Sequence, residues 1–389
     1  MATTGRGGGR GTPIGPTLSA MFTTTIILTL GAIGQLQPAV AEKEAMTPFD
    51  RRTTWLRRHV QRELGAPFAL HETDHFLVFY DRHRMWAQRR GQLLERTYDV
   101  YHRAMREAGW EVHPIGEKLV CVLFFDRRDF GAYAGRTDRI EGKWQNGYYS
   151  RSTNRIAFFN DLSGTASSQL SGRIGRNRAQ LDRMRLRLQR TQRPTQPAEH
   201  ANLQASVQSL QRQIEADTMR QSLIVQRANQ TKTTHEAAHQ LAFNSGLQRR
   251  DAAYPFWVTE GLATSFEALD LGKPFGPGHP NARRHRTLDH AARRGKLVPL
   301  ARLLAAFEAP AHDDRLRELM YAQSWGLFRF LFQRKPAELH GYIQALTRRR
   351  WAPEQDDPLK HFESFFGPVQ QVEALLIEDL LEGPAPKKQ

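Results

Sequence analysis

Residues 231–245 read TKTTHEAAHQLAFNS, and this stretch decides the fold because it predicts a helix that carries two histidines. His235 and His239 are four residues apart, so an α-helix places both imidazoles on one face, one turn apart. Glu236 directly follows the first histidine, and its carboxylate is therefore expected beside any ion held by that pair. Two histidines and a later glutamate form a ligand set of catalytic zinc sites, which leaves a fourth position for water. The stretch therefore predicts a metal site.

A second helix is predicted shortly afterwards, from the sequence WVTEGLATSFE at residues 257–267. It contains Glu260, which lies 21 residues after His239. The first motif alone also arises by chance in a chain with 15 histidines, and the alternative is an ordinary amphipathic helix with two partly exposed histidines. The second stretch favours the metal site.

The two stretches together resemble the gluzincin metallopeptidases, and most closely the peptidase-MA-like group of secreted bacterial proteins. The aminopeptidase branch of that clan is also similar to TEGLATSFE. The resemblance implies one Zn²⁺ per chain, with His235, His239 and Glu260 as ligands. It also implies that Glu236 acts as the general base on a zinc-bound water, so that the protein hydrolyses peptide bonds.

The resemblance extends to two further residues. Glu267 lies where the aminopeptidase branch often has an acidic residue, which implies that it supports a ligand from outside the coordination sphere. Thermolysin-like enzymes have an aspartate four residues after the ligand glutamate, and this chain has Thr264 there.

YAQSWGLFRFLF, from Tyr321, resembles the helix that carries a transition-state tyrosine, whose hydroxyl would donate to the oxyanion. The alternative places Tyr321 on an amphipathic helix that faces the core.

Substrate binding is predicted at the strand RIAFFN, residues 155–160. In gluzincins the strand before the active helix borders the cleft and pairs with the substrate backbone. By this resemblance, residues 156–160 form the edge strand, and Ile156, Phe158 and Asn160 contact a peptide or protein substrate. The G-x-M-E-N strand of the aminopeptidases is absent from the sequence, which argues against a simple aminopeptidase.

Two other functions remain open at this stage. One is a catalytically silent binding or structural protein with a zincin fold. The other is a zinc amidase that acts on cell-wall peptide. Cys121 is the single cysteine of the chain and lies in the apolar run LVCVLFF, so it is expected to be a buried core residue and not a nucleophile.

The first 41 residues are typical of a secretory signal peptide. Arg6 and Arg10 precede the apolar stretch MFTTTIILTLGAIG, and AVA at residues 39–41 is a small-x-small cleavage site. Cleavage near Ala41 would give a secreted, periplasmic or cell-envelope protein, whereas an uncleaved segment would be a membrane anchor. The C-terminal residues 383–389, GPAPKKQ, are expected to be disordered.

Residues 165–230 form a basic insertion with 11 arginines, no lysine and 4 acidic residues, a net charge of +7. Apolar residues recur at helical spacing on both sides of RTQRPTQPAEH, which predicts an antiparallel helical hairpin over 170–227 with a coiled-coil seam. Such an arm suits an acidic polymer or a membrane surface, and the alternative is a solvated structural insert. The segment contains no aromatic residue, so no specific nucleic-acid binding is expected. The oligomeric state is not predicted.

The predicted fold class is α+β and zincin-like. A mixed sheet lobe occupies residues 42–164, and residues 231–382 hold the active helix and a helical lobe. Expected helices lie at 53–64, 84–108, 299–307, 316–333, 336–347 and 369–381, the active helix is expected over 231–245, and expected strands lie at 75–80, 119–125, 147–150 and 155–160.

Overall fold

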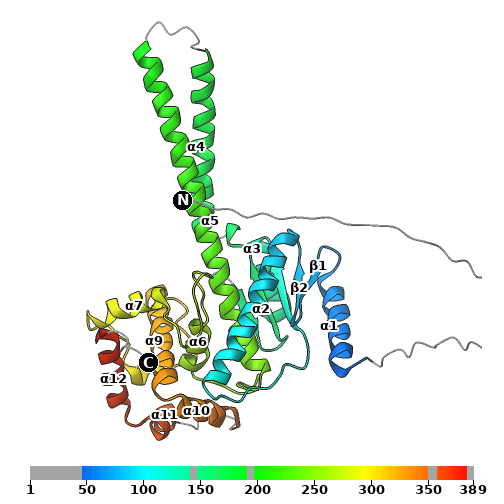
Figure 1. Cartoon of the computed structure of the whole chain (residues 1–389), viewed down its shortest axis with the longest axis vertical. Coiled ribbons are helices and arrows are strands. Elements are labelled where there is room, and N and C mark those ends of the chain that lie inside the picture. The colour runs from blue at the N-terminus through cyan, green and yellow to red at the C-terminus, as the bar shows by residue number, and fades with distance from the viewer. Residues whose placement is uncertain (1–45, 141–146, 164, 191–196, 349–356, 383–389) are drawn as a thin grey trace, which may run out of the picture. The chain divides into compact units, whose positions relative to one another are not determined.

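The computed structural model describes residues 46–140, 147–163, 165–190, 197–348 and 357–382. The predicted signal segment 1–41 and the predicted tail 383–389 lie outside these residues. Within them the fold is α+β, as expected, with one mixed sheet and many helices (Figure 1).

The sheet contains five strands in the order β1-β2-β3-β5-β4. Their bounds are β1 Ala69–Glu72, β2 Phe76–Tyr80, β3 Leu119–Phe124, β4 Gly147–Ser150 and β5 Arg155–Phe159. β2, β3 and β5 are parallel, whereas β1 and β4 pair antiparallel at the two edges. The prediction that 156–160 is an edge strand is therefore wrong. The hairpin folds β4 onto the outer side of β5, so β4 is the edge.

Alternation of side chains along the strands separates two apolar cores. Phe76, Val78 and Cys121 face one side, together with α2 (Arg84–Glu107) and α5 (Pro197–Asn244). Leu77 and Phe79 face the other side, which α1 (Pro48–Leu64) and α3 (Arg127–Tyr133) cover. Cys121 is fully buried, as the apolar run predicts. The short π-helix Ala134–Asp138 and 3-10 helix Asp161–Ser163 complete this half.

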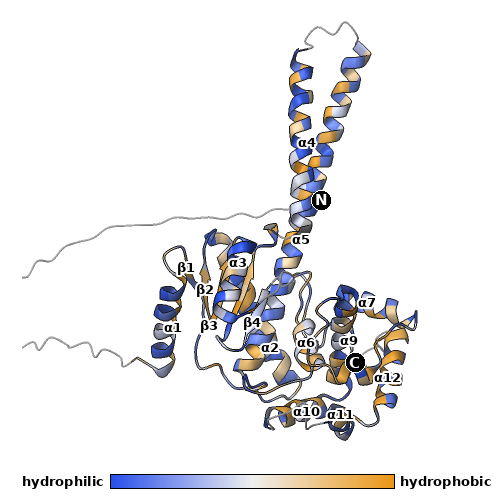
Figure 2. Cartoon of the chain, turned by 180° about the vertical axis from the view of Figure 1, so that it is seen from behind, coloured by the Kyte–Doolittle hydropathy of each residue, from blue (hydrophilic) through white to orange (hydrophobic). Residues whose placement is uncertain are grey.

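The basic insertion is an antiparallel pair of helices, α4 (Thr165–Arg190) and the first half of α5 (Figure 1). Their seam contains the apolar positions that the sequence pattern indicates, from Leu170, Ile174 and Leu181 on α4 to Val207 and Ile214 on α5. Figure 2 shows apolar and hydrophilic residues interspersed along this pair of helices.

The second arm and the active helix are one helix of 48 residues, Pro197–Asn244. This differs from the expected separate helix that starts at Thr231. The physical reason is that, after Pro197, neither proline nor glycine interrupts the sequence before Asn244. The candidate metal-ligand histidines and the arm therefore share one continuous helix.

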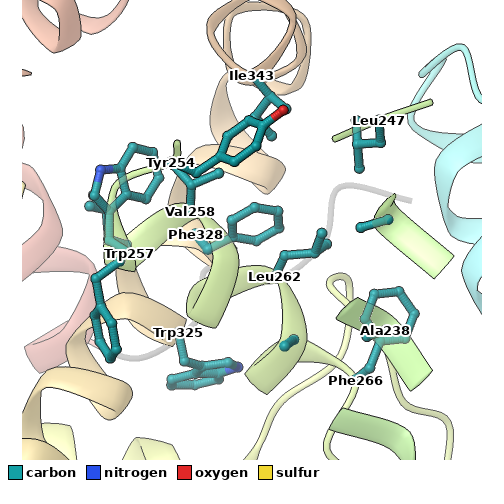
Figure 3. Close-up of a cluster of buried hydrophobic side chains, with 14 of the residues drawn as sticks. Ala238, Leu247, Tyr254, Trp257, Val258, Leu262, Phe266, Trp325, Phe328 and Ile343 are labelled. Carbon is teal, nitrogen blue, oxygen red and sulfur yellow. The ribbon is translucent and has the colours of Figure 1, made fainter. Parts of the chain in front are cut away.

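The C-terminal half is helical. Its helices are α6 Phe256–Ser265, α7 Ala282–Ala292, α8 Leu300–Leu304, α9 Asp314–Arg334, α10 Pro336–Arg348, α11 Pro358–Phe366 and α12 Val369–Glu382. α7 and α11 were not predicted, and α8 is shorter than expected. α6 packs directly on α9, and Figure 3 shows Trp257 and Leu262 of α6 gathered with Trp325 and Phe328 of α9. Gly261 permits this packing, because a Cβ there would lie 2.5 Å from the Ser324 carbonyl oxygen.

Among the described residues, no helix has the length and apolar character that a membrane crossing requires.

Candidate metal centre

The inner half of α5 is held rigidly between the sheet and the helical lobe. Nearly every side chain from Asn229 to Phe243 is buried there, including polar ones. Gln240 donates its side-chain amide to the main-chain oxygens of Val120 and Asn154, at 3.1 and 3.0 Å. These two hydrogen bonds hold the helix turn that carries His239 against the sheet.

The predicted ligands meet at this position. The Nε2 atoms of His235 and His239 are 3.2 Å apart. Glu260, from α6, places Oε2 3.2 Å from Nε2 of His235 and Oε1 3.5 Å from Nε2 of His239. The three residues are grouped closely enough to hold a metal ion.

The geometry of the three donors fits a tetrahedrally coordinated ion. Ligand bonds of about 2.0–2.2 Å in a tetrahedron place neighbouring donor atoms about 3.3–3.6 Å apart. The separation of the two imidazoles, and the separation of each imidazole from the Glu260 oxygen beside it, lie at or within about 0.1 Å of that range. The two imidazoles approach different oxygens of the carboxylate. Oε2 of Glu260 is also buried without a hydrogen-bond donor in the described part of the chain, so an acceptor is free for a cation.

A buried ion pair lies beside one candidate ligand, His235. Oε1 of Glu267 lies 3.4 Å from Nδ1 of His235, although the two do not align as a hydrogen bond. Arg284, on α7, donates to both oxygens of Glu267, at 2.5 and 2.9 Å, and Asn281 donates to Oε2 at 3.1 Å. A carboxylate on the far nitrogen of a ligand histidine fixes its tautomer and ring orientation. Glu267 lies where that role requires.

Carboxylates surround the imidazole pair. Glu260 and Glu267 each lie beside His235, and Glu236 lies near both imidazoles. Burial alone would lower the pKa of His235, but the carboxylates of Glu260 and Glu267 outweigh it and raise that pKa to about 10. Burial would raise the pKa of Glu260 and of Glu267, yet the imidazoles and Arg284 hold both well below the usual range. Such a site favours a cation.

Glu236 lies in a cleft of about 650 Å³ beside the three donors. Gly147 of β4 forms part of the wall, and a Cβ at this position would lie 3.8 Å from Cγ of Glu236. Burial raises the pKa of Glu236, and the two imidazoles only partly oppose this. A second cavity of about 470 Å³ adjoins the same residues on the side of the insertion. The edge strand, the carboxylate and the three donors thus share one cleft.

Tyr321, on α9, lines both cavities. Its ring centroid lies 6.2 Å from that of His235, and the guanidinium of Arg284 covers the ring at 5.2 Å. Burial, followed by the charges of Glu260 and Glu236, raises the pKa of Tyr321 well above its usual value. The phenol therefore stays protonated and can donate a hydrogen bond in the cleft.

Three predicted contacts lie elsewhere. Ile156 and Phe158 are fully buried on an inner strand. Asn160 lines a different cavity, where its Oδ1 accepts from Asn229 at 3.1 Å. The main-chain edge beside the metal centre belongs to Gly147 and Tyr149.

Sequence reasoning also missed Arg284 and Asn281. Asn281 had a visible signal, because it precedes the polar stretch ARRHR and caps α7 by accepting from the main-chain amides of residues 283 and 284. Arg284 had none, since only the tertiary fold brings α7 to Glu267. Thr264 turns away from the site, and its hydroxyl donates to the main-chain oxygen of Glu260 at 2.5 Å.

Residues 229–352 match a family model described as a protein of unknown function, DUF1570. The matched range begins where α5 enters the core and contains the three candidate ligands, Glu267, Arg284 and Tyr321. It covers neither the sheet nor the helical arm. No curated protein is similar enough to the chain to match it.

Proposed function

We propose that this chain is a zinc-dependent hydrolase of gluzincin type that cleaves peptide bonds. The observation that carries the proposal is the convergence of His235, His239 and Glu260. The two imidazole Nε2 atoms are 3.2 Å apart, and they lie 3.2 and 3.5 Å from the two oxygens of the Glu260 carboxylate. One carboxylate and two imidazoles are the donors of a catalytic zinc site that keeps a position open. When bound, zinc supplies an acidified water and polarises a substrate carbonyl.

The remaining residues suit the other parts of such a reaction. Glu236 is the carboxylate that accepts a proton from a water molecule in the cleft and passes it to the leaving amine. The Tyr321 hydroxyl donates to the oxygen that becomes negative. β4 offers an extended main chain beside the cleft, so an extended peptide is bound by strand addition. This supports a peptide substrate over a small amide.

Metal content and cleavage are tested on the same preparation. The protein is purified without chelator, its metal is measured by plasma mass spectrometry, and a proteome-derived peptide mixture is digested with it. We expect one zinc per chain and new peptide termini. Glu236→Gln should retain zinc and lose turnover, whereas Glu260→Ala should lose zinc. Glu338→Gln, a matched change on an exposed face of α10, should alter neither.

Four outcomes would count against the proposal. A parent protein without bound metal would refute the metal centre. Bound zinc with no cleavage by the parent would favour the silent scaffold, and cleavage restricted to cell-wall peptide would favour the amidase. Undiminished cleavage by Glu236→Gln would remove Glu236 as the base.

A further inference from the structure

A cavity separate from the metal centre lies between α2 and the middle of α5, with a volume of about 850 Å³. Different residues of α5 line the two sites. Gln226, Asn229 and Gln230 line this cavity, whereas Ala228, Thr231 and His235 line the cavities around the metal centre. The two sites therefore lie on different faces of the same helix.

The lining of this cavity is cationic. Arg89, Arg90 and Arg96 of α2 belong to it, and among its described lining residues there is neither aspartate nor glutamate. In the described parts of the chain, none of the three arginines has a carboxylate oxygen within ion-pair distance. Arginine stays charged in proteins, so three guanidiniums that lie together without a carboxylate partner leave their positive charge uncompensated.

Arg90 is the informative member of this set because it is only 7% exposed. One of its nitrogens donates to Thr233 Oγ1 at 3.2 Å, and its buried Nε has no acceptor among the described residues. Burial lowers its pKa to about 10, so it remains charged at neutral pH. Asp161 contributes a favourable charge, but Nζ of Lys232 already lies 2.6 Å from that carboxylate.

A buried cation without a counter-ion is costly unless a ligand supplies the negative charge. One carboxylate would be satisfied by a single arginine fork. Three guanidiniums fit an anion that has more acceptor oxygens, and phosphate is the common one.

The mouth of the cavity is apolar as well as cationic. Met85 and Leu162 line it and are 65% and 44% exposed. The exposed Met219 and Leu223 continue this surface along α5, on the helix face of Ser222 and Gln226. We propose that this cavity binds the phosphate group of an amphiphilic ligand, with Arg90 at its base and Arg89 and Arg96 at its rim.

Calorimetric titration tests the pocket with sn-glycerol 3-phosphate as the probe, at constant ionic strength and with acetate as the carboxylate comparison. We expect saturable binding of the phosphate and weaker binding of acetate. Arg90→Gln, and separately the double change Arg89→Gln with Arg96→Gln, should weaken binding about ten- to a hundredfold. Arg106→Gln, which removes the same charge from the far end of α2, should leave it unchanged.

His235→Ala distinguishes this pocket from the metal centre, and binding should survive that change. Flotation with phosphatidylglycerol and phosphatidylcholine vesicles identifies the source of the phosphate. Arg90-dependent flotation with the anionic vesicles would identify a lipid headgroup. Binding of the soluble probe without flotation would overturn the amphiphilic part of the proposal and leave a free organic phosphate as the ligand. The proposal fails if the parent protein does not bind the probe, if both arginine variants bind like Arg106→Gln, or if His235→Ala abolishes binding.

Discussion

Replacing Arg284 with methionine should destabilise the fold and weaken the metal centre together. The Arg284 and Glu267 side chains are 6% and 4% exposed, and two hydrogen bonds of 2.5 and 2.9 Å join them. Methionine fills much of the same volume but leaves Glu267 buried with the Asn281 amide and one imidazole as partners. Removing one member of a buried pair costs about 3–5 kcal/mol. We expect a loss of about 3 kcal/mol, since those two contacts remain.

The second expected effect is on affinity for the metal. Without Arg284, Glu267 no longer holds the His235 ring in place, and loss of such a supporting contact weakens metal binding about 10–100-fold. Urea unfolding in chelator, followed by circular dichroism, measures the free energy of unfolding. Competition with a chromophoric chelator measures the dissociation constant for zinc.

Arg283 offers a matched control on the same helix. Its guanidinium lies 3.0 Å from Glu318, but both side chains are largely solvated, so Arg283→Met should cost less than about 1 kcal/mol. Combining Glu267→Gln with Arg284→Met should recover part of the stability, because no unpaired buried charge remains. If Arg284→Met behaves like Arg283→Met in both assays, the assigned role of the pair is wrong.

Three further predictions concern Gly261, in the packing of α6 on α9, and Gly147 and Tyr321, in the cleft. Gly261→Ala should destabilise the protein by about 1–3 kcal/mol in thermal unfolding, because the new Cβ would lie 2.5 Å from the main-chain oxygen of Ser324. The shift of α6 should also weaken the positioning of the Glu260 carboxylate. Gly131→Ala is the control, since it lies in open space on α3 and should be neutral or slightly stabilising. Gly147→Ala should lower peptide turnover while zinc content stays at the parent level, since its Cβ lies 2.9 Å from Phe158 Cβ at the cleft wall; unchanged turnover would exclude β4 from substrate binding. Tyr321→Phe should reduce kcat about 100-fold with little change in KM, and equal kcat would return Tyr321 to a packing role.

The sequence predicted the local parts of the site well because helix periodicity controls them. His235 and His239 must share a face at a spacing of four, and Glu260 follows on the next predicted helix. The strand order was beyond the same reasoning. GYYS and RIAFFN form a hairpin whether the first or the second of them pairs with β3. Which of the two pairs with β3 depends on how the helices cover both faces of the sheet.

Long-range polar contacts were equally hidden. Arg284 is one of many arginines in the chain, and its partner Glu267 lies 17 residues away, across a loop whose path is not encoded in any short pattern. The unbroken α5 had a readable signal, namely the lack of a proline or glycine between Ala198 and Asn244.

Because α5 is continuous, the direction in which the arm projects is fixed relative to the two imidazoles. Gln221 donates a hydrogen bond across the two arms to the main-chain oxygen of Ser167 at 3.0 Å, and His235 follows 14 residues later on the same helix. Each residue inserted between them would turn the arm by about 100° and advance it by about 1.5 Å relative to the imidazoles. Single-residue insertions and deletions should therefore be rare in this span among related chains, and changes of seven should be tolerated best. Farther out, the arms can lengthen or shorten freely, provided that both change by equal numbers of residues.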